Sequence, residues 1–421
     1  MEKTLISPAL SGTVPAISSK SEAHRALICA ALSDKPTNVI CEYTNNDIDA
    51  TVSCLNSLGA NIVRNGKAFT VNPIKEPTDN ATLDCGESGS TLRFIIPIIA
   101  ALGVNAKINM HGRLPNRPLS PLYELLVENG VSLSPQGSNP LCISGKLKSG
   151  DYEIAANVSS QFISGLLFAL SLCEGDSTLT LTGKIESKNY IDMTLDAQKM
   201  FGAQIEISEN VYKIKGIGKY ISQGECKIMG DWSNAAFFLC AGAMSKDSVC
   251  VSGIDINSSQ GDKKILDVLF SMGANIQIAG DHVTVSPSEL LHEASIDAAQ
   301  IPDLVPIIAT VASVAKGKTI IYNAGRLRLK ESDRIESVCA MITALGGDIT
   351  PTDDGMVIVG KPELMGGVVD SFADHRIAMS AAIASTVCKN PVTIVGCEAV
   401  NKSYPDFFSH FDSINTNSKT N

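Results

Sequence analysis

Residues 57–62 read SLGANI, and the same phrase returns as SMGANI at residues 271–276. Looser copies surround Gly130, Gly202 and Gly346, so the steps between the five central glycines are 71, 72, 71 and 73 residues. Each glycine closes an amphipathic run and precedes residues that alternate between apolar and polar, as a helix C-terminal cap does before a strand. The phrase therefore predicts a series of helix–glycine–strand units of nearly constant length.

A second series, out of phase with the first, consists of small or polar residues that open apolar, alanine-rich helices. Its six members are separated by 69 to 72 residues: Ser19, Ser88, Ser159, Asp231, Asp303 and Asp374. Six repeats of about 72 residues fill a chain of 421 residues. We therefore expect an α/β (α+β) fold of six βαβαββ units in two domains, residues 14–226 and residues 1–13 plus 227–421. A parallel solenoid is the alternative, but the variable turns disfavour a uniform stack.

The last repeat is incomplete at the C-terminal end. Its glycine would fall near residue 418, where the chain instead carries the polar tail 415–421. We expect residues 4–10 to supply the missing closing strand. This pairing would bring the two ends of the chain together in one domain.

The composition excludes several classes of function. The chain has 34 Lys and Arg against 44 Asp and Glu, a net charge of −10 and 44% apolar residues, which is typical of a globular protein without a basic surface for nucleic acid or anionic membranes. The twelve cysteines include no CxxC pair, so they indicate reduced thiols rather than a metal site. No apolar run is long enough to span a bilayer. We expect a cytoplasmic protein.

Cations gather where they oppose the positive end of a helix dipole. Those in or near the first turns of the alanine-rich helices are Lys20, Arg25, Arg93 and Arg376, and those in the following segments are Arg113, Arg117, Lys330, Arg334 and Lys402. Each serine or aspartate that opens a helix is explained equally well as an N-cap. A cation at that end, however, costs about a few tenths of a kcal/mol unless an anion lies beside it. Lys330 and Arg334 would share one face if their segment is helical, as would Ser21 and Arg25. The pattern predicts an anion site.

Nine segments, in chain order, resemble a known family: SGTVPAISSKSEAHRAL (11–27), GESGSTLRF (86–94), RPLSPL (117–122), NVSSQFISGLLFAL (157–170), ESKNYIDMT (186–194), IPDLVPIIAT (301–310), LRLKESDRI (327–335), DHRIAMS (374–380) and KSYPDFF (402–408). Together they resemble, almost end to end, the 5-enolpyruvylshikimate-3-phosphate (EPSP) synthases of the enolpyruvyl transferase family. The resemblance implies two domains of three βαβαββ units each, an inside-out α/β barrel, in agreement with the six repeats.

The resemblance also implies a reaction. Such an enzyme transfers the enolpyruvyl group of phosphoenolpyruvate to the 5-hydroxyl of shikimate 3-phosphate by addition and elimination through a tetrahedral intermediate, and releases phosphate. The product leads to chorismate and the aromatic amino acids, and glyphosate blocks the step. No metal or organic cofactor is implied, and we expect a monomer that binds two small phosphorylated substrates.

The resemblance assigns roles to individual residues. Those implied to bind shikimate 3-phosphate are Lys20, Ser21, Arg25, Ser159, Ser160, Gln161, Ser187, Asp303 and Lys330, with Tyr190 near the same pocket. Those implied to bind phosphoenolpyruvate are Lys20, Gly89, Arg117, Gln161, Arg334, Arg376 and Lys402. Asp303 would take the hydroxyl proton and Glu331 would protonate the methylene carbon. Lys20, His375 and Lys402 would assist proton transfer or the departure of phosphate.

Two positions depart from the family pattern. Glu87 stands where many relatives carry Asn, and Phe94 where some carry Pro. A carboxylate beside an anion pocket repels the substrate unless it is paired, and Glu87 is explained equally well as a first-turn residue favoured by the helix dipole.

Two other functions compete with this interpretation. A UDP-N-acetylglucosamine enolpyruvyl transferase would share the fold and the donor, but typically has a loop cysteine and no DHR. A non-catalytic sugar-phosphate-binding repeat protein would have lost a catalytic group, whereas all of those named above are present.

Overall fold

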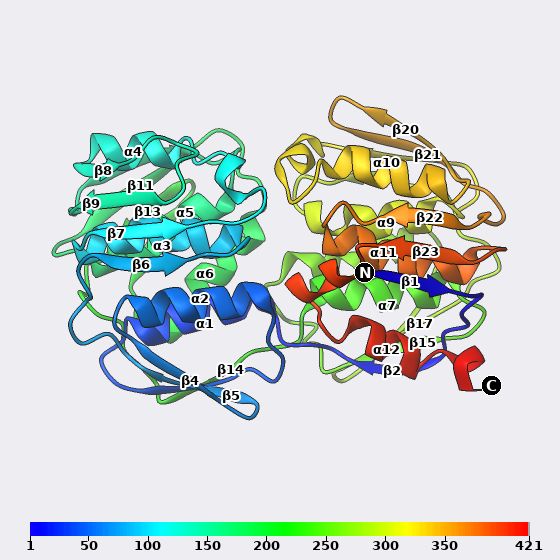
Figure 1. Cartoon of the computed structure of the whole chain (residues 1–421), viewed down its shortest axis with the longest axis horizontal. Coiled ribbons are helices and arrows are strands. Elements are labelled where there is room, and N and C mark those ends of the chain that lie inside the picture. Colours follow the sequence, from blue (N-terminus) through cyan, green and yellow to red (C-terminus); the bar gives the residue numbers. More distant parts are fainter. Residues whose placement is uncertain (420–421) are drawn as a thin grey trace. The chain divides into compact units, whose positions relative to one another are not determined.

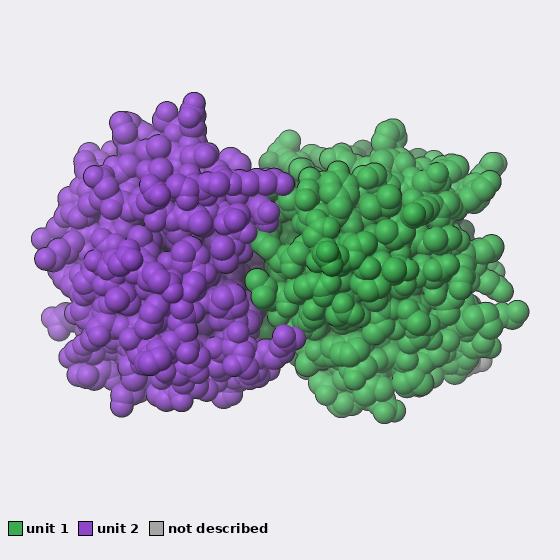
Figure 2. Space-filling view, turned by 90° about the horizontal axis from the view of Figure 1, so that it is seen from above, with its two compact units in different colours: residues 1–17, 229–421 green, residues 18–228 purple. Residues whose placement is uncertain are grey.

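The structure is a computed structural model that describes residues 1–419, and it divides into two compact units. Unit 1 comprises residues 1–17 together with residues 229–421, and unit 2 comprises residues 18–228 (Figure 2). The chain therefore passes from one unit to the other after residues 17 and 228. The boundaries expected from the repeats lie four and two residues earlier.

Unit 2 contains three four-stranded sheets with one shared strand order. In each sheet a parallel pair comes first, and an antiparallel hairpin follows with its second strand beside the pair. In spatial order the sheets are β14 (Glu225–Lys227), β3 (Thr37–Ile40), β5 (Ala68–Asn72), β4 (Asn61–Asn65); β6 (Ala81–Asp84), β7 (Ala106–Asn109), β9 (Leu141–Gly145), β8 (Val131–Leu133); and β10 (Asp151–Ala155), β11 (Ser177–Thr182), β13 (Val211–Ile214), β12 (Ile205–Ser208).

Unit 1 repeats this strand order in two sheets and ends with a sheet of three strands. In spatial order they are β2 (Gly12–Pro15), β15 (Val249–Ser252), β17 (His282–Ser286), β16 (Asn275–Ala279); β18 (Ser295–Asp297), β19 (Lys318–Tyr322), β21 (Gly355–Val359), β20 (Asp348–Thr352); and β22 (Gly367–Asp370), β23 (Val392–Val395), β1 (Glu2–Leu5). The six sheets correspond to the six repeats of the sequence.

The N-terminal strand completes the last repeat. β1 runs antiparallel to β23, with Glu2 opposite Val395 and Leu5 opposite Val392. It takes the place that the closing hairpin strand holds in the other sheets, which confirms the expected terminal pairing. The strand covers residues 2–5 rather than 4–10, and Leu10 adds only an isolated bridge to Asn415.

Six inner helices form the core, three in each unit (Figure 1). They are α1 (Lys20–Ala31), α3 (Gly89–Leu102), α5 (Ser160–Leu172), α7 (Trp232–Met244), α9 (Val305–Ala312) and α11 (His375–Ala384). Five of these helices are apolar on nearly all sides and almost wholly buried, as expected of a helix enclosed by other elements, whereas α1 has a polar first half and a buried apolar second half. The strands alternate buried with more exposed residues, so one face of each sheet is turned outward. The helices lie inside and the sheets outside.

The remaining helices and 3-10 turns connect these sheets. The helices are α2 (Asn46–Ser57), α4 (Leu122–Glu128), α6 (Lys188–Met200), α8 (Ile265–Ser271), α10 (Arg334–Ala344) and α12 (Phe407–Ser413). The 3-10 turns are η1 (Leu114–Asn116), η2 (Gly261–Lys264), η3 (Pro302–Leu304), η4 (Gly325–Leu329), η5 (Ser385–Val387), η6 (Cys397–Lys402) and η7 (Thr416–Lys419). Within residues 1–419 no helix combines the length and the apolar character needed to cross a membrane.

The five repeated glycines all adopt a positive φ, between +79° and +109°, which confirms their expected place after a helix. Gly59 shows why other residues are excluded there. A Cβ atom at this position would lie 2.9 Å from the Glu76 carbonyl oxygen, in addition to the cost of the left-handed backbone. The repeated glycine of the sequence therefore marks the end of a helix in each of these five repeats.

Candidate active site

Within each unit, the predicted site residues lie at the N-terminal ends of the inner helices or in segments beside those ends. Five of the six inner helices are capped by the side chain that the repeat indicates: Ser19, Ser88, Ser159, Asp231 and Asp374. The sixth position, Asp303, behaves differently and is described below with unit 1.

In unit 2, Arg25 is a buried cation of α1 whose side chain is 2% exposed. Its Nε donates to Thr194 Oγ1 at 2.8 Å, and its two terminal nitrogens donate to the carbonyls of Ser21 and Tyr190 at 2.6 and 2.7 Å. The guanidinium also lies 5.2 Å from the ring centre of Phe94. These hydrogen-bond acceptors are neutral, and burial lowers the pKa of Arg25 to about 10. Arg25 is therefore a positive charge suited to an incoming anion.

Lys20 opens α1 and forms an ion pair with Asp47, with 2.9 Å between Nζ and Oδ2. Asp47 lies in the first turn of α2, and both side chains are largely buried, at 17% and 7% exposure. The pair holds the ammonium group at the N-terminal end of α1 beside Ser21. Sequence reasoning found Lys20 but not its carboxylate partner, which lies 27 residues away.

Gly89 opens α3 directly beneath two guanidinium groups. A Cβ atom at this position would lie 2.7 Å from Arg117 Nη1 and 3.0 Å from Arg93 Nη1. Arg93 Nη1 donates to Gln161 Oε1 at 2.7 Å, and Gln161 Nε2 donates to Ser90 Oγ at 2.8 Å. The absence of a side chain at Gly89 thus lets two cations approach a helix N-terminus, an arrangement that can bind a small anion.

Besides Ser21 in α1, the serines predicted to bind substrate lie at two neighbouring helix starts of unit 2. Ser159 caps α5 by accepting from the Gln161 amide at 3.3 Å, and Ser160 is the first residue of that helix. Ser187 precedes α6 with a left-handed backbone, φ 53° and ψ 42°. Such a conformation is uncommon for a residue other than glycine and occurs often at ligand sites. Tyr190, in the first turn of α6, connects this helix start to Arg25 through its carbonyl.

Glu87, the residue that departs from the family pattern, is exposed and lies against the loop at residues 111–113. A Cβ atom on Gly112 would collide with the Glu87 carboxylate, so that loop passes directly over it. The carboxylate is therefore packed against the segment that leads to Arg117.

In unit 1, Asp303 lies inside η3 and does not cap a helix. Its carboxylate instead contacts three cations: Lys330 Nζ at 3.3 Å, Arg334 Nη1 at 2.8 Å and Arg376 Nη2 at 3.4 Å. Burial alone would raise the pKa of Asp303. The attraction of the three cations outweighs burial and the repulsion from Glu331, and it holds the pKa well below the usual range.

Arg334 is the centre of this network, with an exposure of 1%. Besides Asp303 it pairs with Glu331 at 2.9 Å and with Asp374 at 2.8 Å. Burial lowers the pKa of Arg334, but the three carboxylates more than compensate and raise it. Because Asp374 also caps α11 through the Arg376 amide at 3.0 Å, it ties Arg334 to the start of that helix.

Lys330 and Arg334 would share a helix face only if their segment were helical, and it is not. Residues 325–329 form a 3-10 turn, Lys330 is extended with φ −87° and ψ −160°, and α10 begins only at Arg334. The two cations nevertheless both reach Asp303, because a loop and a helix start converge on it. Burial lowers the pKa of Lys330 to about 8, while Asp303 opposes that shift.

The other predicted residues of unit 1 lie at the start of α11 and on the turn packed against it. His375 is 1% exposed, with its Nδ1 atom 3.6 Å from Asp374 Oδ1. Arg376 donates to the Asp303 carbonyl at 3.0 Å and to Ser233 Oγ at 2.7 Å. Lys402 ends η6 and is 7% exposed. These residues belong to the same region of unit 1 as Asp303.

Several residues that hold the predicted ones were missed in the sequence. Arg93 was noticed only as a cation near a helix start, although it contacts Gln161. Asp262 is buried in η2 and interacts with both Asp303 and Arg376. No local signal could have found Asp262, because each of these partners is more than 40 residues away in the sequence.

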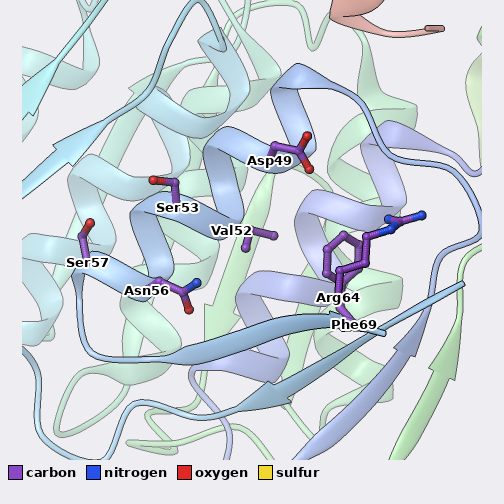
Figure 3. A pocket seen from close by; sticks show the side chains of 7 residues that line it. All are labelled: Asp49, Val52, Ser53, Asn56, Ser57, Arg64 and Phe69. Carbon is purple, nitrogen blue, oxygen red and sulfur yellow. The ribbon is translucent and has the colours of Figure 1, made fainter. Parts of the chain in front are cut away.

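A separate groove of about 580 Å³ lies in unit 2 between α2 and the β4–β5 hairpin (Figure 3). Its lining residues are Asp49, Val52, Ser53, Asn56, Ser57, Arg64 and Phe69. The Arg64 guanidinium lies 5.0 Å from the ring centre of Phe69. None of the predicted site residues lines this groove. In residues 1–419, no three His, Cys, Asp or Glu side chains are grouped as metal ligands would be.

Comparisons with known proteins agree with the resemblance found in the sequence. The family model described as EPSP synthase (3-phosphoshikimate 1-carboxyvinyltransferase) matches residues 6–411. The chain is 42% identical to the 3-phosphoshikimate 1-carboxyvinyltransferase of Clostridium novyi, with 98% of each chain covered. It is 43% identical to that of Clostridium beijerinckii, with 96% of this chain and 95% of the relative covered. A solved EPSP synthase from Acinetobacter baumannii superimposes with a TM-score of 0.81 at 26% identity, covering 99% of this chain and 98% of the other.

Proposed function

The chain belongs to the EPSP synthase family, and from this premise we propose how its residues divide the work of the reaction. It is a transferase, a 3-phosphoshikimate 1-carboxyvinyltransferase of aromatic amino acid biosynthesis. It moves the enolpyruvyl group of phosphoenolpyruvate to the 5-hydroxyl of shikimate 3-phosphate. The observation that carries the assignment of roles is the carboxylate of Asp303 among three cations.

Asp303 is the base for the attacking hydroxyl. When no substrate is bound, the three cations hold the pKa of Asp303 so low that its carboxylate is a weak base. Phosphoenolpyruvate on Arg334 and Arg376, and shikimate 3-phosphate on Lys330, would neutralise these cations. The pKa of Asp303 would then rise toward the range in which a carboxylate accepts a proton. The base becomes effective when the substrates are in place.

Glu331 is the proton donor to the methylene carbon, and its pairing with Arg334 at 2.9 Å supports a fixed position. In the addition step the hydroxyl oxygen bonds to C2 of phosphoenolpyruvate while the methylene carbon gains a proton. In the elimination step the resulting methyl group loses a proton as the carbon–oxygen bond to phosphate breaks. The methyl proton returns to Glu331, and the proton that Asp303 took from the hydroxyl passes to the departing phosphate, so both carboxyl groups return to their starting states.

The resemblance assigns substrate binding to residues of each unit. For shikimate 3-phosphate they are, in unit 2, Lys20, Ser21, Arg25, Ser159, Ser160, Gln161 and Ser187 and, in unit 1, Asp303 and Lys330. For phosphoenolpyruvate they are, in unit 2, Lys20, Gly89, Arg117 and Gln161 and, in unit 1, Arg334, Arg376 and Lys402. Support comes from the neutral hydrogen-bond partners of Arg25 and from the two guanidinium groups over Gly89. Phosphate oxygens form strong charge-assisted hydrogen bonds with such cations.

Lys20, His375 and Lys402 complete the catalytic set. Lys20 and Lys402 are cations for the phosphate that leaves, and His375 is proposed as an aid to proton transfer. We further propose that the enzyme acts in the cytoplasm as a monomer and needs neither a metal nor an organic cofactor. Gel filtration tests whether the enzyme is a monomer, and an assay in the presence of a chelator tests whether it needs a metal.

Phosphate release from phosphoenolpyruvate tests the function directly. Release should require shikimate 3-phosphate and should not occur with UDP-N-acetylglucosamine as acceptor. The Asp303→Ala variant is the control for background hydrolysis. Release with the UDP-sugar alone would identify the other transferase, and the absence of release with either acceptor would leave only a binding function.

A further inference from the structure

We propose that His24 is a positioning residue for the start of α3 and that it acts through the hydroxyl groups of Thr51 and Thr91. The proposal rests on the proposed function, because Gly89 at that helix start is assigned to phosphoenolpyruvate. His24 lies in α1, Thr51 in α2 and Thr91 in α3, so the three side chains join three helices of unit 2. None of the three has a role in the mechanism above.

A continuous chain of hydrogen bonds connects these side chains to Ser88, the cap of α3. His24 Nδ1 lies 2.7 Å from Thr51 Oγ1, and Thr51 Oγ1 lies 2.7 Å from Thr91 Oγ1. Thr91 Oγ1 donates to Ser88 Oγ at 2.8 Å, and Ser88 Oγ also accepts from the Thr91 amide at 3.3 Å. The Asp47 carbonyl, 3.4 Å from Thr91 Oγ1, is the weaker second acceptor. The four residues of the chain are at most 1% exposed, so water does not compete for their hydrogen bonds.

The direction of the chain follows from its two ends. At the helix cap the Thr91 hydroxyl donates its single hydrogen, so Thr91 accepts from Thr51, and Thr51 then accepts from His24. At the other end, His24 Nε2 is buried and has no hydrogen-bond partner among the residues that the structure describes. A buried N–H without an acceptor is less common than an unpaired acceptor, so the ring proton lies on Nδ1. Both ends give the same direction, from His24 to the helix cap.

The surroundings of His24 keep its ring neutral. Burial lowers the pKa of His24 to about 3, and repulsion from Lys20 and Arg25 on the same helix adds to this shift. Attraction from Asp47 of α2 opposes the shift without cancelling it. The ring also meets Phe94 of α3 edge-on, with 6.4 Å between the ring centres. A neutral imidazole has a single N–H, so the donor on Nδ1 is present throughout the pH range of an enzyme assay.

The chain links two helix starts that are assigned to the same substrate. Lys20 opens α1 four residues before His24, and Gly89 opens α3 directly after Ser88. Because the Ser88 hydroxyl both caps α3 and ends the chain, the chain fixes the first turn of α3 against α1. Without it, the start of α3 would meet phosphoenolpyruvate in a less defined geometry, which lowers affinity without removing a reacting group.

Two substitutions at Thr51 separate the hydrogen bond from packing. Thr51→Val keeps the shape of the side chain and removes the hydroxyl, whereas Thr51→Ser keeps the hydroxyl and removes the methyl group. In steady-state phosphate release at saturating shikimate 3-phosphate, Thr51→Val should raise the KM for phosphoenolpyruvate about 3- to 10-fold, as for one lost neutral hydrogen bond, and change kcat by less than about twofold. Thr51→Ser should keep the KM of the wild type. If only packing mattered, Thr51→Ser would be the more affected variant, because it leaves a cavity.

Thr310→Val is the matched control. Thr310 of α9 is equally buried, but its hydroxyl donates to the Pro306 carbonyl of its own helix at 3.0 Å, so the substitution should leave KM unchanged. An unchanged KM in Thr51→Val, an equal rise in both Thr51 variants, or a loss confined to kcat would each overturn the proposal. A wild type that releases no phosphate would refute the proposed function, whereas an active wild type with an unaffected Thr51→Val variant would refute only the hydrogen-bond chain.

The position of the ring proton can be observed without measuring activity. In wild-type protein labelled with ¹⁵N at histidine, the signals of His24 are identified by their absence in His24→Phe, which keeps an aromatic ring at this position. Nuclear magnetic resonance should show a protonated Nδ1 and an unprotonated Nε2 that stay unchanged between about pH 5 and 8, where an ordinary histidine titrates. A proton on Nε2, or titration of the His24 ring in this range, would contradict the direction of the chain and overturn the proposal.

Discussion

Arg25 in unit 2 and Arg334 in unit 1 are both buried guanidinium groups, with exposures of 2% and 1%, yet their charges are balanced in opposite ways. Arg25 donates only to a hydroxyl and two carbonyls, and burial lowers its pKa to about 10. Arg334 binds three carboxylates, which raise its pKa despite burial.

The difference separates binding from chemistry. A buried cation with neutral partners carries a desolvation cost that an anionic ligand can relieve. The charge of a buried cation that contacts three carboxylates is already compensated. Such a cation instead stabilises the ionised form of those carboxylates. We therefore expect changes around Arg25 to affect substrate affinity and changes around Arg334 to affect turnover.

The largest expected effect follows from removing a carboxylate of unit 1. Asp303→Ala should lower kcat by roughly 10²- to 10⁴-fold, because general base catalysis typically contributes that much. The affinity for shikimate 3-phosphate, measured by calorimetry, should change far less. Asp353→Ala, which removes an exposed carboxylate of the same unit, is a matched control. Near-normal turnover of the Asp303 variant would defeat both the assignment and the distinction between the units.

The corresponding change in unit 2 is Arg25→Gln. It should weaken shikimate 3-phosphate binding by about 10- to 100-fold, because a charge-assisted hydrogen bond is worth about 1.5–3 kcal/mol, and it should leave kcat at saturation within a few-fold. Titration calorimetry and initial rates measure the two quantities. Arg64→Gln, at an exposed arginine of unit 2, should change neither. A loss confined to kcat would reverse the proposed roles.

A smaller effect is expected from adding a side chain at Gly89 of unit 2. Gly89→Ala places a Cβ atom 2.7 Å from Arg117 Nη1, so the guanidinium must move outward, at a cost of about 1–3 kcal/mol. The KM for phosphoenolpyruvate should rise, and inhibition by the bulkier glyphosate should weaken more than that. Inhibition constants for both enzymes measure the effect. Equal inhibition of wild type and variant would contradict this view of the pocket.

The smallest effect concerns pH. Because the pKa of Lys330 is lowered to about 8, this lysine loses its charge as the pH rises through 8, whereas an ordinary lysine stays charged to above 10. The affinity for shikimate 3-phosphate should therefore decline above pH 8, by at most about tenfold per pH unit. Lys330→Arg should abolish the decline, since arginine stays charged. A wild-type profile that is flat to pH 10 would show that Lys330 does not bind the substrate.

Much of the fold could be predicted because its signals are local. The five glycines mark helix ends, and five of the six serine or aspartate positions are N-caps, features decided within one turn of each residue. The missing strand of the last repeat was also predictable, from the length of the chain divided by the period. Asp303 was found by resemblance, although it breaks the capping rule of its own series.

Residue spacing alone could not tell how Lys330 and Arg334 meet in the site. Lys330 and Arg334 are four residues apart, as neighbours on a helix would be, but a 3-10 turn and an extended residue precede α10. Their common contact with Asp303 comes from tertiary packing instead. Asp262 interacts with Asp303 and Arg376, each more than 40 residues away in the chain, so no sequence spacing could indicate it.

The sequence by itself determined the six repeats, the helix ends and the type of charge at each of them, because backbone capping and hydrophobic periodicity depend on near neighbours. Only the tertiary structure decided how each charge is balanced. Arg25 meets Thr194 and Tyr190 across more than 160 residues of chain, and Arg334 meets Asp374 across 40. Such contacts set the pKa of each buried group, because burial and the nearest charge, rather than the residue type, determine which ionised form is stable.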